Sequence, residues 1–126
     1  MQRLNGRVPG RLAQIALAAL ISLSACASGP AATAEKMTRA MYAGDVAGAT
    51  ASMDTDLAKK VTSSDISELS ESMQKLGTMQ SFTLSKSAVD QRKYEYVAQF
   101  DKGTMNVDVA FDPDGKVSDF HVFDGD

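Results

Sequence analysis

Residues 94–111, with the sequence YEYVAQFDKGTMNVDVAF, contain two runs in which apolar and polar side chains alternate. The apolar positions of the two runs are Tyr94, Tyr96, Ala98, Phe100, Met105, Val107, Val109 and Phe111. A period of two residues is typical of a β-strand that is buried on one side. Between the runs, Asp101-Lys102-Gly103 suits a short hairpin turn with the glycine in the left-handed conformation. The stretch therefore predicts two antiparallel strands joined by a tight turn.

A further strand is predicted on each side of this hairpin. Phe82 and Leu84 alternate with polar residues upstream, and residues 117–123 supply an apolar stretch near the C-terminal end. The segment Asp112-Pro113-Asp114-Gly115 has the composition of a turn and separates the last two strands. We therefore expect a curved sheet of four antiparallel strands.

The chain upstream of these strands has helical spacing instead. A first helix is expected from Thr33 onward, with Met37 and Met41 on one side and Gly44 just after its last turn. Asp45 is a residue type that caps helix N-termini, and it predicts a short second helix that runs to about residue 51.

Two more helical segments follow. Asp54 can cap a helix over residues 55–61, and residues 62–65, TSSD, have the form of a capping box. Beyond the box, apolar residues recur every three or four positions up to Gly77: Ile66, Leu69, Met73 and Leu76. Helices followed by a meander of strands predict an α+β domain, with two to three N-terminal helices packed on one face of the curved sheet.

Composition limits the kinds of protein that this chain can be. A length of 126 residues suits one domain, and 44% hydrophobic with 23% charged residues is typical of a globular protein. The formal net charge is -3, and without Arg3, Arg7 and Arg11 ten basic residues face sixteen acidic ones, which gives -6. An acidic surface repels phosphate backbones, so nucleic acid is not an expected partner.

The N-terminus has the layout of an export signal, which we assign to residues 1–25. A basic stretch is followed by an apolar run over residues 12–23, too short for a bilayer crossing of roughly 20 residues. The sequence Leu23-Ser24-Ala25-Cys26 then resembles the lipobox of bacterial lipoproteins. This resemblance implies cleavage before Cys26, a diacylglyceryl group on its sulfur and acylation of the new amino terminus. The alternative is an ordinary buried Cys26 with cleavage elsewhere.

Lipid on Cys26 would determine where the protein is and what it contacts. Cys26 is the only cysteine, so the chain forms no internal disulfide. Residues 26–33 are expected to be the lipidated cysteine and a flexible tether, and residues 34–126 a single domain. We therefore expect an exported protein anchored to the cell envelope. In a host with two membranes, Ala27 resembles outer-membrane sorting, with the domain facing the periplasm.

The folded part resembles a known superfamily. The stretch MYAGDVAGATASMDTDLAKKVTSSDISELSESMQKLGTMQSF at residues 41–82 and the closing FDPDGKVSDFHV at residues 111–122 carry the resemblance. They are similar to small bacterial domains of unknown function allied to the nuclear-transport-factor-two-like, or cone-fold, superfamily. The resemblance covers residues 34–123 and consists of turn and capping signals. It implies a curved sheet wrapped against helices, a cone whose mouth can hold a ligand, and domains that often pair through the exposed face of the sheet, where Val97 and Ala110 would lie.

Candidate catalytic residues are few. His121 is the only histidine and could act as a general base near neutral pH, with Asp108 or Asp119 beside it. A solvated or edge position on the last strand is the alternative for His121, and both aspartates would then keep that side of the sheet in water. Because cone-fold enzymes place carboxylates, His and Tyr in the cavity, we take His121, Asp108, Tyr94 and Tyr96 as the set to test for catalysis.

The sequence predicts neither a metal site nor a cofactor. Asp112, Asp114 and Gly115 resemble the start of a calcium loop, but Pro113 intervenes and no glutamate follows at the required distance. A β-turn accounts for the same residues. Nucleophile-elbow, P-loop and dinucleotide-binding patterns are absent from the sequence.

Three functions are consistent with these features. We expect a non-catalytic module at the cell envelope that binds an envelope protein or a small ligand, because the chain combines an anchor with no catalytic motif. The first alternative is a cone-fold enzyme that acts on a small apolar or envelope-derived molecule. The second is a structural accessory lipoprotein, which is favoured if the protein's own side chains fill the cone.

Overall fold

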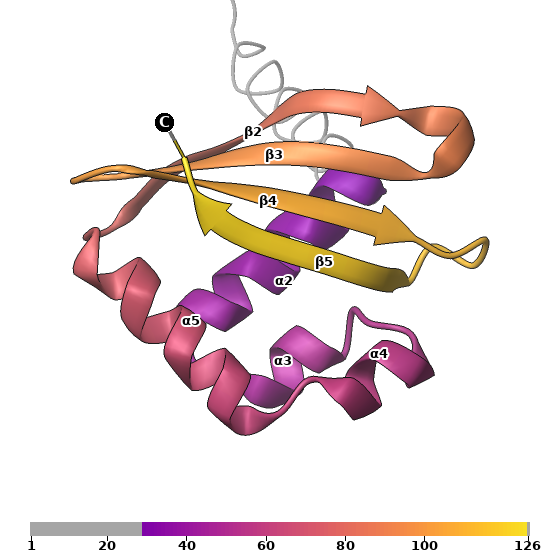
Figure 1. The fold of residues 1–126 in the computed structure, drawn as a ribbon, viewed down its shortest axis with the longest axis horizontal. Helices are drawn as coiled ribbons and strands as arrows, with labels where there is room; N and C mark the ends of the chain where they lie inside the picture. Colours follow the sequence, from indigo (N-terminus) through magenta and orange to yellow (C-terminus); the bar gives the residue numbers. More distant parts are fainter. Residues whose placement is uncertain (1–28, 126) are drawn as a thin grey trace, which may run out of the picture.

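The computed structural model describes residues 29–125, which fold as helices followed by an antiparallel sheet (Figure 1). The four strands lie in the order β2-β3-β4-β5, so that each strand pairs with its neighbour in sequence. The helices are α2 (Pro30–Ala43), α3 (Val46–Thr50), α4 (Thr55–Lys60) and α5 (Ser63–Lys75). The strands are β2 (Met79–Ala88), β3 (Lys93–Phe100), β4 (Thr104–Phe111) and β5 (Val117–Asp124), with the short 3-10 helix η1 (Val89–Gln91) after β2. The α+β class is confirmed, with four helices among the described residues.

The central hairpin forms as its alternation predicts. Tyr96 of β3 lies opposite Val107 of β4, and both side chains are buried. One detail of its turn was wrong, because Gly103 does not have a positive φ. The turn is instead held from outside: Lys102 N–H donates to Leu76 O at 2.8 Å, and the Asp101 carboxylate accepts from Thr78 N–H at 2.9 Å. These tertiary bonds remove the need for a left-handed glycine in the turn.

Local signals place the helix ends. Gly44 ends α2 with φ 72°, and the Asp45 side chain accepts from Gly48 N–H at 3.0 Å to cap α3. The capping box before α5 is complete, since the Thr62 hydroxyl accepts from Asp65 N–H at 3.1 Å and the Asp65 carboxylate accepts from Thr62 N–H at 2.9 Å. The three predicted caps at Asp45, Asp54 and Thr62 are confirmed.

The start of the domain lies earlier than expected. Helix α2 begins at Pro30, and Thr33 N–H donates to Gly29 O at 2.9 Å in its first turn. Proline suits the first position of a helix because that position needs no N–H donor and already has the φ that proline imposes. The flexible tether expected over residues 26–33 is therefore wrong for residues 30–33, which are helical. Cys26 and the signal over residues 1–25 lie outside the described residues.

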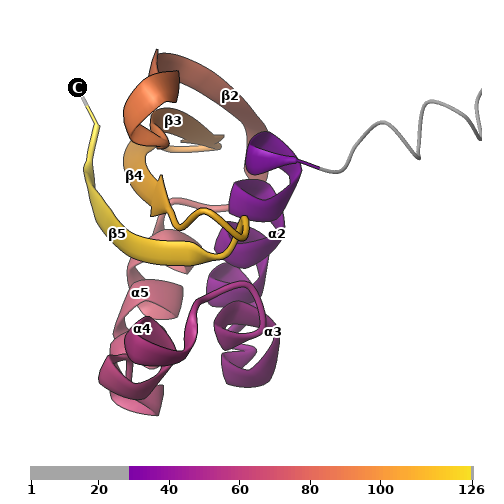
Figure 2. The same cartoon turned by 90° about the vertical axis from the view of Figure 1, so that its right-hand side faces the viewer.

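The sheet curves around α2, and the other helices lie beneath it (Figure 2). The core between these layers is made of methionine, aromatic and aliphatic side chains from both. Its largest side chains with almost no exposure are Tyr96, Met37, Met41, Ile66 and Met73. The start of β5 is fixed to the segment before α4 by Asp54 N–H to Val117 O at 2.7 Å and Val117 N–H to Ser52 O at 2.8 Å.

Strand β2 departs from simple alternation. Its register with β3 shifts between Met79 and Ser81 and again between Leu84 and Lys86. Leu84, an apolar position of the predicted strand, is 54% exposed although it lies opposite the buried Tyr96. An edge strand has a neighbour on one side only, so the helices and β3 do not cover Leu84.

Candidate functional site

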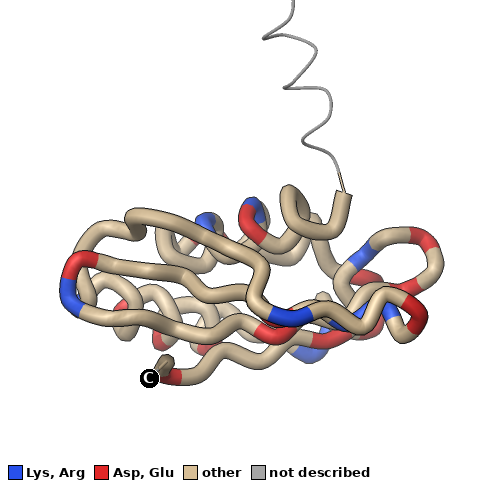
Figure 3. The backbone as a smooth tube through the Cα atoms, turned by 90° about the horizontal axis from the view of Figure 1, so that it is seen from above, with Lys and Arg blue, Asp and Glu red and all other residues tan. Residues whose placement is uncertain are grey.

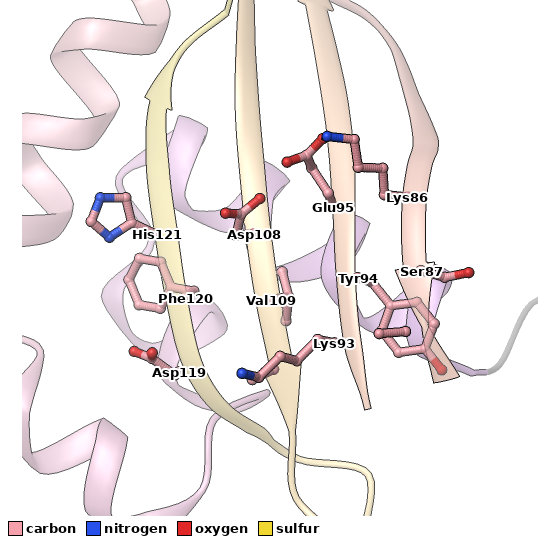
Figure 4. A pocket seen from close by; sticks show the side chains of 12 residues that line it. Lys86, Ser87, Lys93, Tyr94, Glu95, Asp108, Val109, Asp119, Phe120 and His121 are labelled. Atoms are coloured by element: carbon pink, nitrogen blue, oxygen red, sulfur yellow. The ribbon is translucent and has the colours of Figure 1, made fainter. Parts of the chain in front are cut away.

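A line of four ionisable side chains crosses the face of the sheet that is turned away from α2 (Figure 4). The strand register places them opposite one another, one on each strand: Lys86, Glu95, Asp108 and His121. We call this line the outer-face row. His121 and Asp108 were expected as a catalytic pair, and the structure makes them direct neighbours across β4 and β5.

Asp108 is the most constrained member of the outer-face row. Its Oδ1 atom is buried and has no hydrogen-bond donor among the described residues. Burial raises the pKa of this carboxyl, and the charge of Glu95 and a hydrogen bond with the Glu95 carboxyl raise it further. His121 and Lys86 act against this rise. Two carboxylates have no proton to share, so the Glu95 hydrogen bond exists only when one of the pair is protonated.

Lys86 contributes little to holding the row together. Its Nζ lies 3.9 Å from Glu95 Oε1, and its side chain is 80% exposed. An ion pair of this length and exposure is screened by water and contributes at most a few tenths of a kcal/mol. Lys86, on β2 and so two strands away from Asp108, is therefore only a weak counter-charge for the Asp108 carboxylate.

The row borders a shallow depression of about 590 Å³ in the outer face. A second line of residues runs beside the row, with Lys93 opposite Ala110 and Ala110 opposite Asp119. Because the side chain of Ala110 is small, it leaves a hollow in the outer face between the charged side chains of Lys93 and Asp119. The depression thus offers both signs of charge and is open to solvent, whereas sites for apolar small molecules are usually enclosed.

The two tyrosines of the predicted set lie on the opposite face. Tyr96 is 1% exposed and stacks on Phe82, with ring centroids 4.9 Å apart. Burial raises its pKa to about 12, and the charge of Tyr94 adds to the rise. Tyr94 borders the depression, but its ring packs against Tyr96 at 6.3 Å and Phe111 at 5.7 Å. The structure therefore separates the tyrosines from Asp108 and His121.

His121 and Asp119 occupy the edge strand β5, and both are exposed. The His121 ring lies 5.8 Å from the Phe123 ring, between centroids. This is the solvated edge position that was the alternative to a catalytic role. Water therefore reaches the imidazole freely.

Sequence reasoning missed Lys86 and Glu95. The signal for Glu95 was present, because the hairpin turn at residues 101–103 sets the register that pairs Glu95 with Asp108. No such signal existed for Lys86, which reaches the row through the register shift after Leu84.

The segment from Asp112 to Lys116 forms the turn that was the alternative to a calcium loop. Asp112 Oδ1 accepts from Asp114 N–H and Lys116 N–H, each at 2.9 Å, and Gly115 has the positive φ of 86°. Across residues 29–125 no group of three His, Cys, Asp or Glu side chains is placed to hold a metal ion.

The interior of the cone is filled by the protein's own side chains. Met37, Met41 and Met73 have no exposed surface and occupy the space between the sheet and the helices. A depression of about 370 Å³ lies beside the N-terminal end of α2. It is lined by Gly29, Pro30, Thr33, Arg92, Tyr94, Phe111, Asp112, Pro113 and Gly115. The space in which the superfamily resemblance implied a ligand is therefore occupied by these core side chains.

No protein-family model, curated protein or solved structure matches this chain. The resemblances to lipoproteins and to the cone-fold superfamily therefore stay predictions. None of the helices within residues 29–125 has the length and apolar character that a membrane crossing requires.

Proposed function

We propose that this protein is a cell-envelope lipoprotein anchored through Cys26, and that its domain is a non-catalytic binding module whose contact surface is the outer face of the sheet. The single observation that carries the binding role is Asp108, whose buried Oδ1 has no donor although it lies on an open face. A buried acceptor without a partner costs about 1–3 kcal/mol. A partner that brings an N–H donor to this position would recover that cost on binding.

The filled core decides where a partner can bind. Because methionine and aromatic side chains occupy the interior, a ligand inside the cone has no room. A filled cone also favours the structural accessory role. We rank binding first because a purely structural domain gains nothing from an unpaired carboxylate oxygen in an open depression.

The anchor is supported by the sequence alone. The basic stretch, the short apolar run and Leu23-Ser24-Ala25-Cys26 occur in the order that lipoprotein export requires. Two or three acyl chains would hold the protein on the membrane permanently, whereas one chain holds it only marginally. Mass spectrometry of the N-terminal peptide, with Cys26→Ser as the control, tests this part. Release of the native protein by salt washing would contradict it.

The binding role is tested by recovery of a partner from envelope extracts with the full-length protein. Asp108→Asn keeps the side-chain size but removes the acceptor charge, and it should abolish the specific recovery. Glu71→Gln on the exposed side of α5 is the matched control and should leave recovery unchanged. Equal recovery by both variants, or recovery of neither a protein nor a small molecule by the unmodified chain, would exclude this role.

A second candidate function is supported by the His121–Asp108 pair. A histidine directly across the sheet from a carboxylate can be oriented as a general base, and this arrangement favours an enzyme acting on a small envelope-derived molecule. We rank it second because the imidazole is exposed and the tyrosines lie on the other face. If a turnover is found, His121→Ala and Asp108→Asn should each abolish it. Unchanged rates would eliminate the enzyme.

A homodimer through the outer face stays a prediction. Val97 and Ala110 lie on this face, as expected, and both are half-buried. The charged residues Glu95 and Asp108 lie next to them on the same strands. Analytical ultracentrifugation with Val97→Lys tests it, because a charge at the centre of the face would dissociate such a dimer.

A further inference from the structure

The geometry points to one end of the domain as a membrane-contacting surface that rests on the phospholipid headgroups. This inference depends on the lipid at Cys26 that forms part of the proposed function. We call this surface the anchor end, and it consists of Gly29 and Pro30 where the chain enters α2, residues 89–93, and the turn over residues 112–116. Val89 would enter the headgroup layer, and Arg92 and Lys93 would contact lipid phosphates.

The length of chain between the lipid and the fold is the first reason. Only Ala27, Ser28 and Gly29 separate Cys26 from Pro30, where α2 begins. Four residue steps span at most about 14 Å, even when they are extended. Because the headgroup layer of one leaflet is itself roughly 5–7 Å thick, the start of α2 is held close against the membrane surface.

The three segments of the anchor end lie together in the fold. Residues from all three segments line the depression of about 370 Å³, and Phe111 N–H donates to Arg92 O at 2.9 Å, which ties the two turns to each other. The tube view shows the start of α2 at the same end of the molecule as these turns (Figure 3). If the lipid on Cys26 holds Pro30 at the membrane, the two turns therefore lie at the membrane as well.

Charge favours the same orientation. At the anchor end three basic residues, Arg92, Lys93 and Lys116, balance three acidic ones, Asp90, Asp112 and Asp114. The net charge of -6 expected after Cys26 therefore comes entirely from the rest of the domain. An anionic lipid surface repels that remainder within about a Debye length and does not repel the neutral end.

The turn after β2 presents one apolar side chain, one acidic side chain (Asp90) and two basic side chains. Val89 is 67% exposed, the highest value among the large hydrophobic residues described. Arg92 has a φ of 56°, a conformation that a side chain makes costly, and its N–H donates to Val89 O at 3.0 Å. Lys93 follows at the start of β3 and is exposed. An apolar tip beside cations is the composition that membrane interfaces bind.

Site-specific fluorescence quenching tests the orientation with the lipidated full-length protein. Lipid consumes the thiol of Cys26, the only cysteine, so a single engineered cysteine can be labelled. Val89→Cys carries the probe at the anchor end, and Lys102→Cys in the β3–β4 turn is the matched control at the opposite end of the strands. The vesicles contain phosphatidylethanolamine and phosphatidylglycerol, with brominated acyl chains as the quencher.

We expect at least about twofold stronger quenching at Val89 than at Lys102, because only the first probe would reach the acyl boundary. A probe on Pro113→Cys, in the neighbouring turn, should be quenched as strongly as the probe on Val89→Cys. This second position shows whether the result depends on one substitution. Equal quenching at the two ends of an acylated, vesicle-bound protein would overturn the orientation and leave the anchor intact. Absence of acyl groups by mass spectrometry would instead overturn the anchor, and the orientation with it.

Discussion

The two faces of the one sheet differ in almost every physical respect, although the same strands build both. The inner face supplies Tyr96, Ala98, Val107 and Val109, all buried against α2 and the neighbouring helices. The outer face carries the row of charged side chains and is open to solvent (Figure 4). Side chains alternate along each strand, so the apolar ones point to the inner face and the charged ones to the outer face. The inner face packs against the helices, and only the outer face is free to contact another molecule.

Burial has opposite consequences on the two faces. On the inner face it raises the pKa of Tyr96 to about 12, which costs nothing near neutral pH because the phenol is already uncharged. On the outer face it raises the pKa of Asp108, a group that is charged at neutral pH when it is exposed. The outer face therefore carries an electrostatic cost that the inner face does not.

The largest expected effect is on the inner face. Tyr96→Ala removes a ring that stacks on Phe82 and contacts Tyr94, and it leaves a cavity in the core. We expect a loss of about 3–5 kcal/mol in the free energy of unfolding, measured by urea denaturation. Leu84→Ala is the matched control, because Leu84 lies directly opposite Tyr96 but is 54% exposed, and it should cost less than about 1 kcal/mol. Equal losses would mean that the inner face is not the core.

Local sequence signals predicted the inner face better than the outer one. The alternation in residues 94–111 was enough for the central strands, and Asp45 and Thr62 located two helix starts through their capping hydrogen bonds. The start of α2 was misplaced although Pro30 signalled it. The outer-face row depends on pairing across four strands, and Lys86 enters it through a register shift after Leu84 in the edge strand β2. Such a shift has no local signature.

The second effect is on the outer face and depends on pH. Folding raises the pKa of Asp108 above its unfolded value, so the folded protein holds the proton more tightly than the unfolded chain. The contribution of Asp108 to the free energy of unfolding therefore falls as the pH rises from the unfolded pKa through the folded one. Asp108→Asn removes this loss, so it should be more stable than the unmodified protein at about pH 7.

The advantage of Asp108→Asn should shrink as the pH falls toward about 4, because a protonated Asp108 is as neutral as asparagine. Urea denaturation at a series of pH values measures the difference between the two proteins. Asp119→Asn, which removes an exposed carboxylate from the same face, is the matched control. A gain in stability that is the same at every pH would contradict the titration of Asp108 as its cause.

The smallest effect separates the contribution of Lys86 from that of Glu95. Lys86→Met removes a 3.9 Å ion pair whose lysine is 80% exposed, so the free energy of unfolding should change by only about 0.5 kcal/mol or less. The two neighbours nevertheless act on Asp108 with opposite signs. Loss of the Lys86 charge should raise the pKa of Asp108 further, whereas Glu95→Gln should lower it. The pKa of Asp108 in each variant is measured from its carboxyl carbon chemical shift by NMR across a pH titration. Shifts of the same sign would mean that the row does not act as a connected set of charges.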